Sequence, residues 1–76
     1  MFDTQKFGRA IAAFRKEADM TQNEVADRLN LSRQAVSRYE CGESFPDISI
    51  LVQIAELFGI SLDILIAYGD PTAGEA

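Results

Sequence analysis

Two consecutive short segments near the middle of the chain carry their own start and stop signals for a helix. Thr21 is followed three residues later by Glu24, which is the capping-box pattern, and Asn30 tolerates the left-handed backbone that ends a helix. Ser32 can cap the second segment and Gly42 can end it. Because the first stop and the second start nearly adjoin, the sequence predicts two short helices joined by a tight turn.

Apolar periodicity predicts three further helices and no strands. The first begins near Thr4 and ends near Glu17, the fourth is capped by Asp47 and ends at Gly59, and the fifth covers residues 61–69. The residues expected on the inner faces of the first four helices are Phe7, Ala10, Ile11, Phe14 and Ala18, then Val25, Ala26 and Leu29, then Ala35, Val36 and Tyr39, then Ile48, Leu51, Ile54, Ala55 and Phe58. We therefore predict one all-α domain over residues 1–69 and a disordered tail over residues 70–76.

The composition excludes several classes of protein. The chain has one cysteine, Cys41, and no histidine, so it offers neither an internal disulfide nor a zinc site nor a thiol nucleophile with its base. It has no phosphate-binding glycine loop and no carboxylate pair at a spacing typical of catalysis. We predict a protein that is not an enzyme and has no cofactor, no metal and no assigned role for Cys41. The N-terminus lacks the features of a signal or transit peptide, and no apolar run suits a membrane, which predicts a soluble cytoplasmic protein without a membrane partner.

Charge is divided unevenly along the chain. The net charge is −5, which is unusual for a protein that binds phosphates. Residues 1–40 hold all seven basic residues against six acidic ones, whereas residues 41–76 hold six acidic residues and no basic one. The basic half can approach DNA and the acidic half cannot, and the weak positive charge predicts modest, salt-sensitive nonspecific binding.

The outer face of the predicted helix after Ser32 carries side chains suited to contacts with base edges. Arginine can bond guanine with two hydrogen bonds, glutamine suits adenine and serine suits either base. The candidate base-contacting residues are Arg33, Gln34, Ser37 and Arg38. The amides that open this helix and the preceding one suit phosphate. The candidate phosphate contacts are Gln22, Asn23 and Ser32. A polar face of this kind is also the ordinary solvent-facing side of a helix, and spacing alone does not separate the two interpretations.

The stretch TQNEVADRLNLSRQAVSRYECGESFP resembles the lambda-repressor-like, Cro-type helix-turn-helix family, also called the xenobiotic response element family. The similarity continues on both sides and covers nearly the whole chain except the tail; it includes Phe7, Gly8, Ile11, Phe14, Arg15, Ile48, Leu51, Ile54, Ala55, residues 58–61 and Leu65. The resemblance implies a compact five-helix DNA-binding domain whose third helix contacts the major groove through the four residues named above. It also implies a partly buried ion pair between Arg15 and Glu40, which ties the first helix to the third.

Three positions depart from the family pattern. Asp19 and Asn30 stand where the family often has glycine, and both residue types can adopt a left-handed backbone, so we expect the turns to form. Glu43 follows the third helix where the family often has a basic residue that faces phosphate. An acidic side chain there either turns away from DNA or weakens binding.

The fifth predicted helix carries more apolar side chains than a two-turn helix can bury on one face. An exposed apolar patch on a small protein usually marks an interaction surface, and the resemblance implies two-fold dimers formed near this helix. The candidate interface residues are Ile64, Ile66 and Tyr68. In the alternative, the first and fourth helices cover both sides of the fifth, which is then entirely core.

The sequence therefore predicts a transcriptional regulator, a homodimeric repressor that binds double-stranded DNA with a two-fold operator. Two copies one helical turn apart contact a longer site than one short helix can. In the alternative, the same fold is a protein-interaction module without sequence-specific DNA binding, and its acidic half is the working surface.

Overall fold

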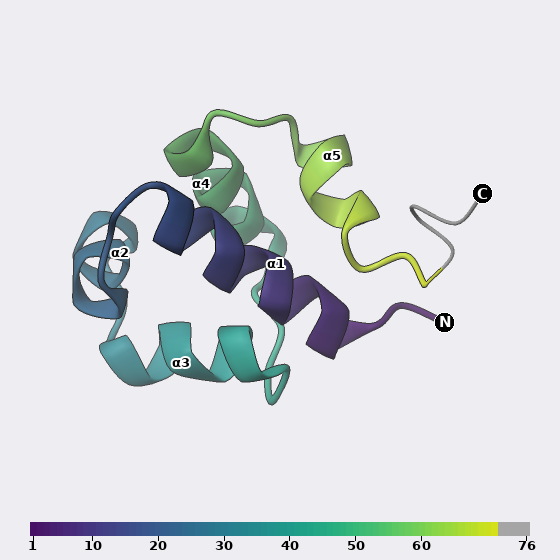
Figure 1. Cartoon of the computed structure of the whole chain (residues 1–76), viewed down its shortest axis with the longest axis horizontal. Coiled ribbons are helices and arrows are strands. Elements are labelled where there is room, and N and C mark those ends of the chain that lie inside the picture. Colours follow the sequence, from purple (N-terminus) through teal and green to yellow (C-terminus); the bar gives the residue numbers. More distant parts are fainter. Residues whose placement is uncertain (72–76) are drawn as a thin grey trace.

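Five helices make up the part of the chain that the computed structural model describes, residues 1–71. They are α1 (Thr4–Glu17), α2 (Gln22–Leu29), α3 (Arg33–Cys41), α4 (Ile48–Phe58) and α5 (Leu62–Ala67). Helix α1 passes through the middle of the molecule, with α3 on one side of it and α4 and α5 on the other (Figure 1). This arrangement confirms the predicted all-α class. No helix within residues 1–71 combines the length and apolar character that a membrane span requires.

Local hydrogen bonds set the helix boundaries where the capping pattern predicts them. Each of Thr21, Ser32, Asp47 and Ser61 accepts the backbone N–H three residues further on, and Thr21 and Glu24 form the complete capping box. Glu24 accepts the backbone N–H of Thr21, and this hydrogen bond lowers the pKa of the Glu24 carboxyl. The sequence did not predict that Asp3 caps α1, where it accepts from the N–H groups of residues 5 and 6.

Left-handed residues end the helices as predicted. Asn30 has φ 61° and Gly42 has φ 77° at the ends of α2 and α3, and Asp19 has φ 59° in the turn after α1. Asp19 and Asn30, which stand where the family often has glycine, therefore adopt the left-handed backbone that these two turns require. One boundary differs from the prediction: α5 ends at Ala67 rather than at Gly69, because the chain turns at Tyr68.

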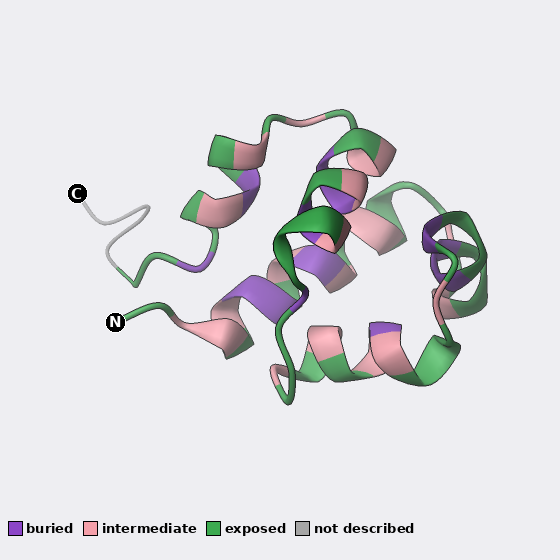
Figure 2. Cartoon of the chain, turned by 180° about the vertical axis from the view of Figure 1, so that it is seen from behind, coloured by how far each residue is buried: buried purple, intermediate pink, exposed green. Residues whose placement is uncertain are grey.

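The core receives side chains from every helix (Figure 2). The largest fully buried side chains are Phe7, Ile11, Val25, Val36, Ile54 and Leu65. Two residues predicted on inner faces lie outside. Ala18 is exposed because α1 has already ended there. Ile48 is 65% exposed because the buried stripe of α4 also takes in Ile50 and Leu57, which rotates Ile48 toward solvent.

The N-terminal residues hold the C-terminal end of the domain in place. The backbone N–H of Asp3 donates to the carbonyl of Gly69 at 2.7 Å, and the ring of Phe2 occupies the space beside Gly69. Lys6 donates to the carbonyl of Asp70 at 2.9 Å, so the first predicted tail residue is bonded to α1. Residues 72–76 of the predicted disordered tail lie outside the described residues. The predicted domain boundary after residue 69 therefore stays a prediction.

Helices α1 and α3 cross at a point where only glycine fits. A Cβ atom on Gly8 would lie 2.4 Å from the backbone oxygen of Tyr39 and 2.5 Å from that of Glu40. Backbone atoms cannot rotate away as a flexible side chain can, so a methyl group at this point has to push α3 away from α1. The crossing fixes the position of α3 against the body of the domain.

We expect Gly8→Ala to destabilise the protein by about 1 to 3 kcal/mol, the usual effect of overpacking. The sign of this change in the free energy of unfolding is informative, because alanine at an unconstrained helix position stabilises by roughly 0.5 to 1 kcal/mol relative to glycine. Urea unfolding followed by circular dichroism measures the effect, with Arg9→Ala at the adjacent exposed position as the control expected within about 0.5 kcal/mol of the parent. A Gly8→Ala variant as stable as the parent would show that the crossing is loose.

Candidate nucleic-acid interface

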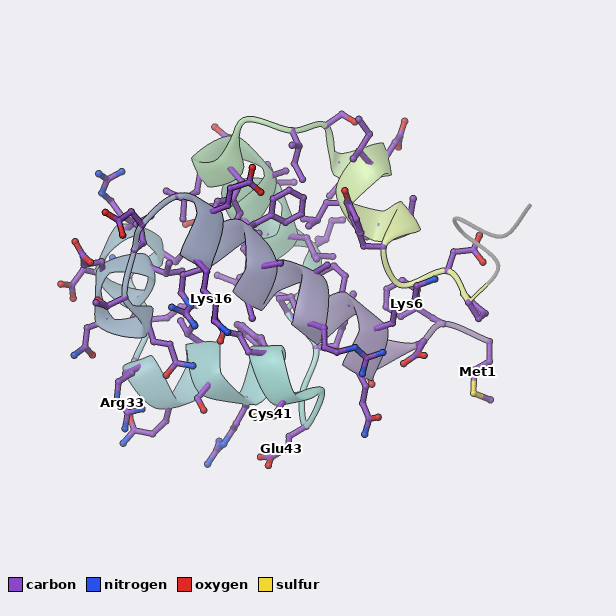
Figure 3. The ribbon with its side chains drawn as sticks, in the orientation of Figure 1. Met1, Lys6, Lys16, Arg33, Cys41 and Glu43 are labelled. Atoms are coloured by element: carbon purple, nitrogen blue, oxygen red, sulfur yellow. The ribbon has the colours of Figure 1, made fainter. Side chains whose placement is uncertain are left out.

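The outer face of α3 presents the predicted base-contacting side chains together. Arg33, Gln34 and Arg38 are exposed, Ser37 is half-buried, and the opposite face is anchored by Val36, which is 1% exposed. Figure 3 shows Arg33 at the start of α3, with its side chain directed away from the body of the domain, and Cys41 and Glu43 at the other end. The helix therefore offers a polar, mainly basic surface that is left open by the rest of residues 1–71.

The starts of α2 and α3 place the predicted phosphate contacts close to this surface. Asn23 is exposed in the first turn of α2. Ser32 caps α3 by accepting the backbone N–H of Ala35 at 3.1 Å, which leaves its hydroxyl hydrogen available to donate to another oxygen. The positive ends of the helix dipoles add a favourable field for an anion at both places.

The predicted pair between Arg15 and Glu40 is present and has two hydrogen bonds. Arg15 Nε lies 2.6 Å from Glu40 Oε2, and Arg15 Nη2 lies 3.1 Å from Glu40 Oε1. The side chains are only 13% and 7% exposed. The bond to Glu40 raises the pKa of Arg15, against the opposing effect of burial. Arg15 Nη1 also donates to the carbonyl of Met20 at 3.0 Å, so the pair joins α1, the turn before α2, and α3.

Gln22 has a position that the sequence did not reveal. Its side-chain Nε2 donates to Glu40 Oε1 at 3.0 Å, and its Oε1 accepts from Arg33 Nη1 at 3.5 Å. Gln22, a predicted phosphate contact, thus also connects the Arg15–Glu40 ion pair to Arg33, a predicted base contact. Arg33 and Glu40 lie 11 and 18 positions from Gln22 in the chain, and the docking of α2 against α3 brings the three residues together.

Acidic groups limit the basic surface at its far end. Glu43 is exposed just after α3, and its backbone N–H closes the helix by donating to the carbonyl of Arg38 at 3.0 Å. Figure 3 shows the carboxyl group of Glu43 on the same outer side as α3. The nearby hydroxyl of Tyr39 has a raised pKa because of burial and the charge of Asp47, so it stays protonated at neutral pH. Positive potential is therefore strongest at the Arg33 end.

A second surface lies on α5. Ile64 is 51% exposed and Tyr68 is 40% exposed, as predicted, whereas Ile66 is partly buried and packs against the core. The ring of Tyr68 meets the ring of Phe14 edge-on with centroids 5.2 Å apart, which extends this apolar surface onto α1. The expectation that Ile66 faces outward is wrong, because Ile66 packs against the core and lies beside Met1 and Phe2 of the N-terminal segment.

Two capped helices joined by a tight turn, the second with an exposed basic face, define the helix-turn-helix class of DNA-binding domain. A model of a helix-turn-helix family matches residues 11–65 of the chain. The chain belongs to this lambda-repressor-like, Cro-type helix-turn-helix family of transcriptional regulators, as its sequence indicates.

Individual proteins show the same likeness. The chain is 35% identical over 60 residues to the uncharacterized HTH-type transcriptional regulator YqaE of Bacillus subtilis, covering 79% of this chain and 52% of YqaE. It is 37% identical over 60 residues to the cryptic phage CTXphi transcriptional repressor RstR of Vibrio cholerae, covering 79% of this chain and 54% of RstR. The chain thus spans about half the length of these relatives. The restriction-modification controller protein C.AhdI of Aeromonas hydrophila shares the fold, with a TM-score of 0.76 and 22% identity over 82% of this chain and 94% of that one.

We expect Arg15→Ala and Glu40→Ala each to lower the free energy of unfolding by roughly 3 kcal/mol, because each leaves the other charge nearly buried without its partner. The double variant should lose less than the two single losses combined, by about 1 to 3 kcal/mol, since no unpaired charge then remains. Chemical unfolding of all four proteins completes the cycle. Strict additivity would show that the pair contributes no coupling energy.

Proposed function

We propose that the protein is a sequence-specific DNA-binding transcriptional regulator, acting in the cytoplasm as a dimeric repressor that inserts α3 into the major groove. The observation that carries the proposal is the outer face of α3, where Arg33, Gln34 and Arg38 are exposed on a helix fixed from behind by Val36. Repression requires only that a bound protein occupy a promoter, so it needs no catalytic group.

Each part of the surface has a separate role in this proposal. The base-contacting residues are Arg33, Gln34, Ser37 and Arg38, whose donors and acceptors suit base edges in the major groove. Asn23 and Ser32, with Gln22 beside them, contact phosphate and set the position of α3 on the duplex. Helices α4 and α5 lie on the far side of α1 from α3 (Figure 1), so in this orientation they do not face the DNA.

The proposed dimer uses α5. One α3 helix of nine residues contacts only a few base pairs, whereas a two-fold dimer contacts two half-sites about one helical turn apart. Ile64 and Tyr68 supply the exposed apolar surface that such an interface requires, and Ile66 supports them from its partly buried position.

A second candidate function has one observation in its favour. Residues 41–76 carry six acidic residues and no basic one, and Glu43 places one of these charges beside the end of α3. Such a surface suits a basic protein partner better than a phosphate backbone. In this alternative the protein is an interaction module that does not recognise a DNA sequence.

The first test is selection of bound sequences from a random DNA pool at moderate salt. We expect the parent protein to enrich a two-fold-related motif, and the Arg33→Ala, Arg38→Ala double variant to lose it, because these side chains can contact guanine. Circular dichroism confirms that the variant is folded. A folded parent protein that enriches no motif would favour the interaction module.

The dimer is tested by replacing two isoleucines of similar exposure. Ile64→Glu on α5 should shift the sedimentation coefficient from that of a dimer to that of a monomer, because it puts a charge into an apolar interface. Ile48→Glu, at the 65% exposed start of α4, is the matched control and should leave the dimer intact. A parent protein that sediments as a monomer at all concentrations, or a dimer broken only by Ile48→Glu, would contradict the proposed interface.

A further inference from the structure

We propose that Phe2 is a positioning residue for the proposed dimer: its ring holds the end of α5 against the loop after α3, so that it sets the distance between the two α3 helices of the dimer. The inference rests on the proposed dimeric DNA-binding function and deepens it by naming a determinant of half-site spacing. Phe2 lies outside all five helices, and its ring contacts both the chain after α5 and the loop after α3.

The position of α5 depends on the contacts around it. The helix has only six residues, Leu62–Ala67, and the buried one is Leu65. A helix shorter than about 12 residues is marginal in isolation, so packing at its sides and ends has to hold it. Residues 59–61 join α5 to α4 at one end. At the other end, the chain after α5 runs beside the N-terminal segment (Figure 1).

Backbone groups after α5 are bonded to the N-terminal segment. The backbone N–H of Asp3 donates to the carbonyl of Gly69 at 2.7 Å, and Lys6 Nζ donates to the carbonyl of Asp70 at 2.9 Å. Figure 3 shows Lys6 at this place, beside the segment that follows α5. Because both acceptors are backbone carbonyls, these bonds fix the path of the chain. Asp3 also caps α1, so the end of α5 is tied to the start of α1.

The ring of Phe2 occupies the space beside Gly69. A Cβ atom on Gly69 would overlap three atoms of this ring. The ring centroid lies 5.8 Å from that of Phe7 and 5.0 Å from that of Phe45, in tilted and edge-on orientations that aromatic rings prefer. Phe7 is 1% exposed in the core, and Phe45 lies in the loop between α3 and α4. The ring therefore joins the end of α5 to both places.

The same segment also bonds the end of α3. Thr4 Oγ1 donates to the carbonyl of Gly42 at 3.3 Å. Gly42 ends α3, where its backbone N–H donates to the carbonyl of Arg38, one of the proposed base-contacting residues. The end of α5 and the end of the proposed DNA-contacting helix are therefore both attached to residues 2–6.

This attachment bears on the spacing of the two half-sites. In the proposed dimer the copies meet through α5 and contact DNA through α3, so the distance between the two α3 helices depends on how firmly each α5 is held. One base pair inserted between the half-sites moves the second by about 3.4 Å along the DNA axis. A rigid dimer fits one spacing, whereas a flexible connection lets the same two modules reach several. Loosening α5 should therefore weaken the preference among spacings.

Two substitutions remove the ring contact from opposite sides. Phe2→Ala removes the ring itself. Gly69→Ala keeps Phe2 but puts a methyl group where its ring lies, and the backbone of Gly69 is not left-handed, so alanine is not strained there. Val52→Ala is the matched control, because Val52 is 39% exposed against 37% for Phe2 and lies on α4, outside the cluster of three rings.

Hydrogen exchange followed by mass spectrometry tests the hold on α5 without DNA and without a dimer, when every protein carries Ile64→Glu and sediments as a monomer. We expect Phe2→Ala and Gly69→Ala each to speed exchange of the amides of residues 62–68 by roughly three- to tenfold and to leave α3 unchanged. In the Phe2→Ala background Gly69→Ala should add less than about twofold, because the ring is already absent. Val52→Ala should leave α5 within about twofold of the parent.

Binding to a set of operators tests the consequence for DNA recognition. The set contains the motif selected by the parent protein and the same half-sites with one base pair inserted or removed between them. The parent protein should prefer its selected spacing by roughly tenfold or more, and Phe2→Ala and Gly69→Ala should each reduce this preference by about three- to tenfold. The ratio of two affinities does not depend on the fraction of protein folded, so a small loss of stability does not affect it. Val52→Ala should keep the preference of the parent.

Three results would overturn the proposal. Exchange of α5 at the rate of the parent would show that the ring of Phe2 does not hold the helix. Additive effects of Phe2→Ala and Gly69→Ala would show that they do not act through one contact. An unchanged spacing preference in Phe2→Ala would show that the hold on α5 does not set the spacing. A parent protein that selects no two-fold motif would contradict the proposed function and with it the spacing role, while the exchange measurement would still decide whether Phe2 holds α5.

Discussion

The bond between Arg15 and Glu40 connects the three helices that carry and support the proposed DNA-contacting surface. Arg15 comes from the last turns of α1 and also bonds the carbonyl of Met20 before α2, while Glu40 comes from the end of α3 and also bonds Gln22 at the start of α2. A buried ion pair by itself adds little net stability, because desolvation offsets the attraction. Its value here is geometric: it fixes two helix ends and one connecting turn relative to one another through donors and acceptors that fit only in this arrangement.

The helix boundaries could be predicted from the sequence because capping is local. Thr21, Ser32 and Asp47 bond amides three residues away, so their effect does not depend on how the helices pack. The rotation of a helix about its axis is not local, which explains why Ile48 and Ile66 differ from their predicted faces. On α3 the prediction was correct for Val36, which is buried, and for the exposed Arg33 and Arg38, whereas Ser37 is half-buried. The contact of Gln22 with Glu40 joins distant residues, and an acidic residue near the end of α3 gives no sign of which glutamine it meets.

An acidic protein that binds DNA must restrict where its charges lie. The basic residues all precede Cys41, and the acidic second half forms the loop after α3, then α4 and α5, with the two helices across α1 from α3. Long-range electrostatic attraction between the protein and DNA phosphates is therefore weak, and Glu43 reduces it further at one end of α3. In the proposed function, the affinity for DNA therefore has to come from close contacts and from the pairing of two copies, which makes the orientation of each proposed base-contacting side chain more important.

One set of residues on α3 serves both the fold and the proposed DNA-contacting surface. Helix α3 is held at its middle by Val36, at the Gly8 crossing by direct backbone contact, and at its end by Glu40. Glu40 belongs to the fold through Arg15 and reaches the outer surface through Gln22. Two hydrogen bonds, from Gln22 to Glu40 and from Arg33 to Gln22, therefore connect the buried pair to a proposed base-contacting side chain.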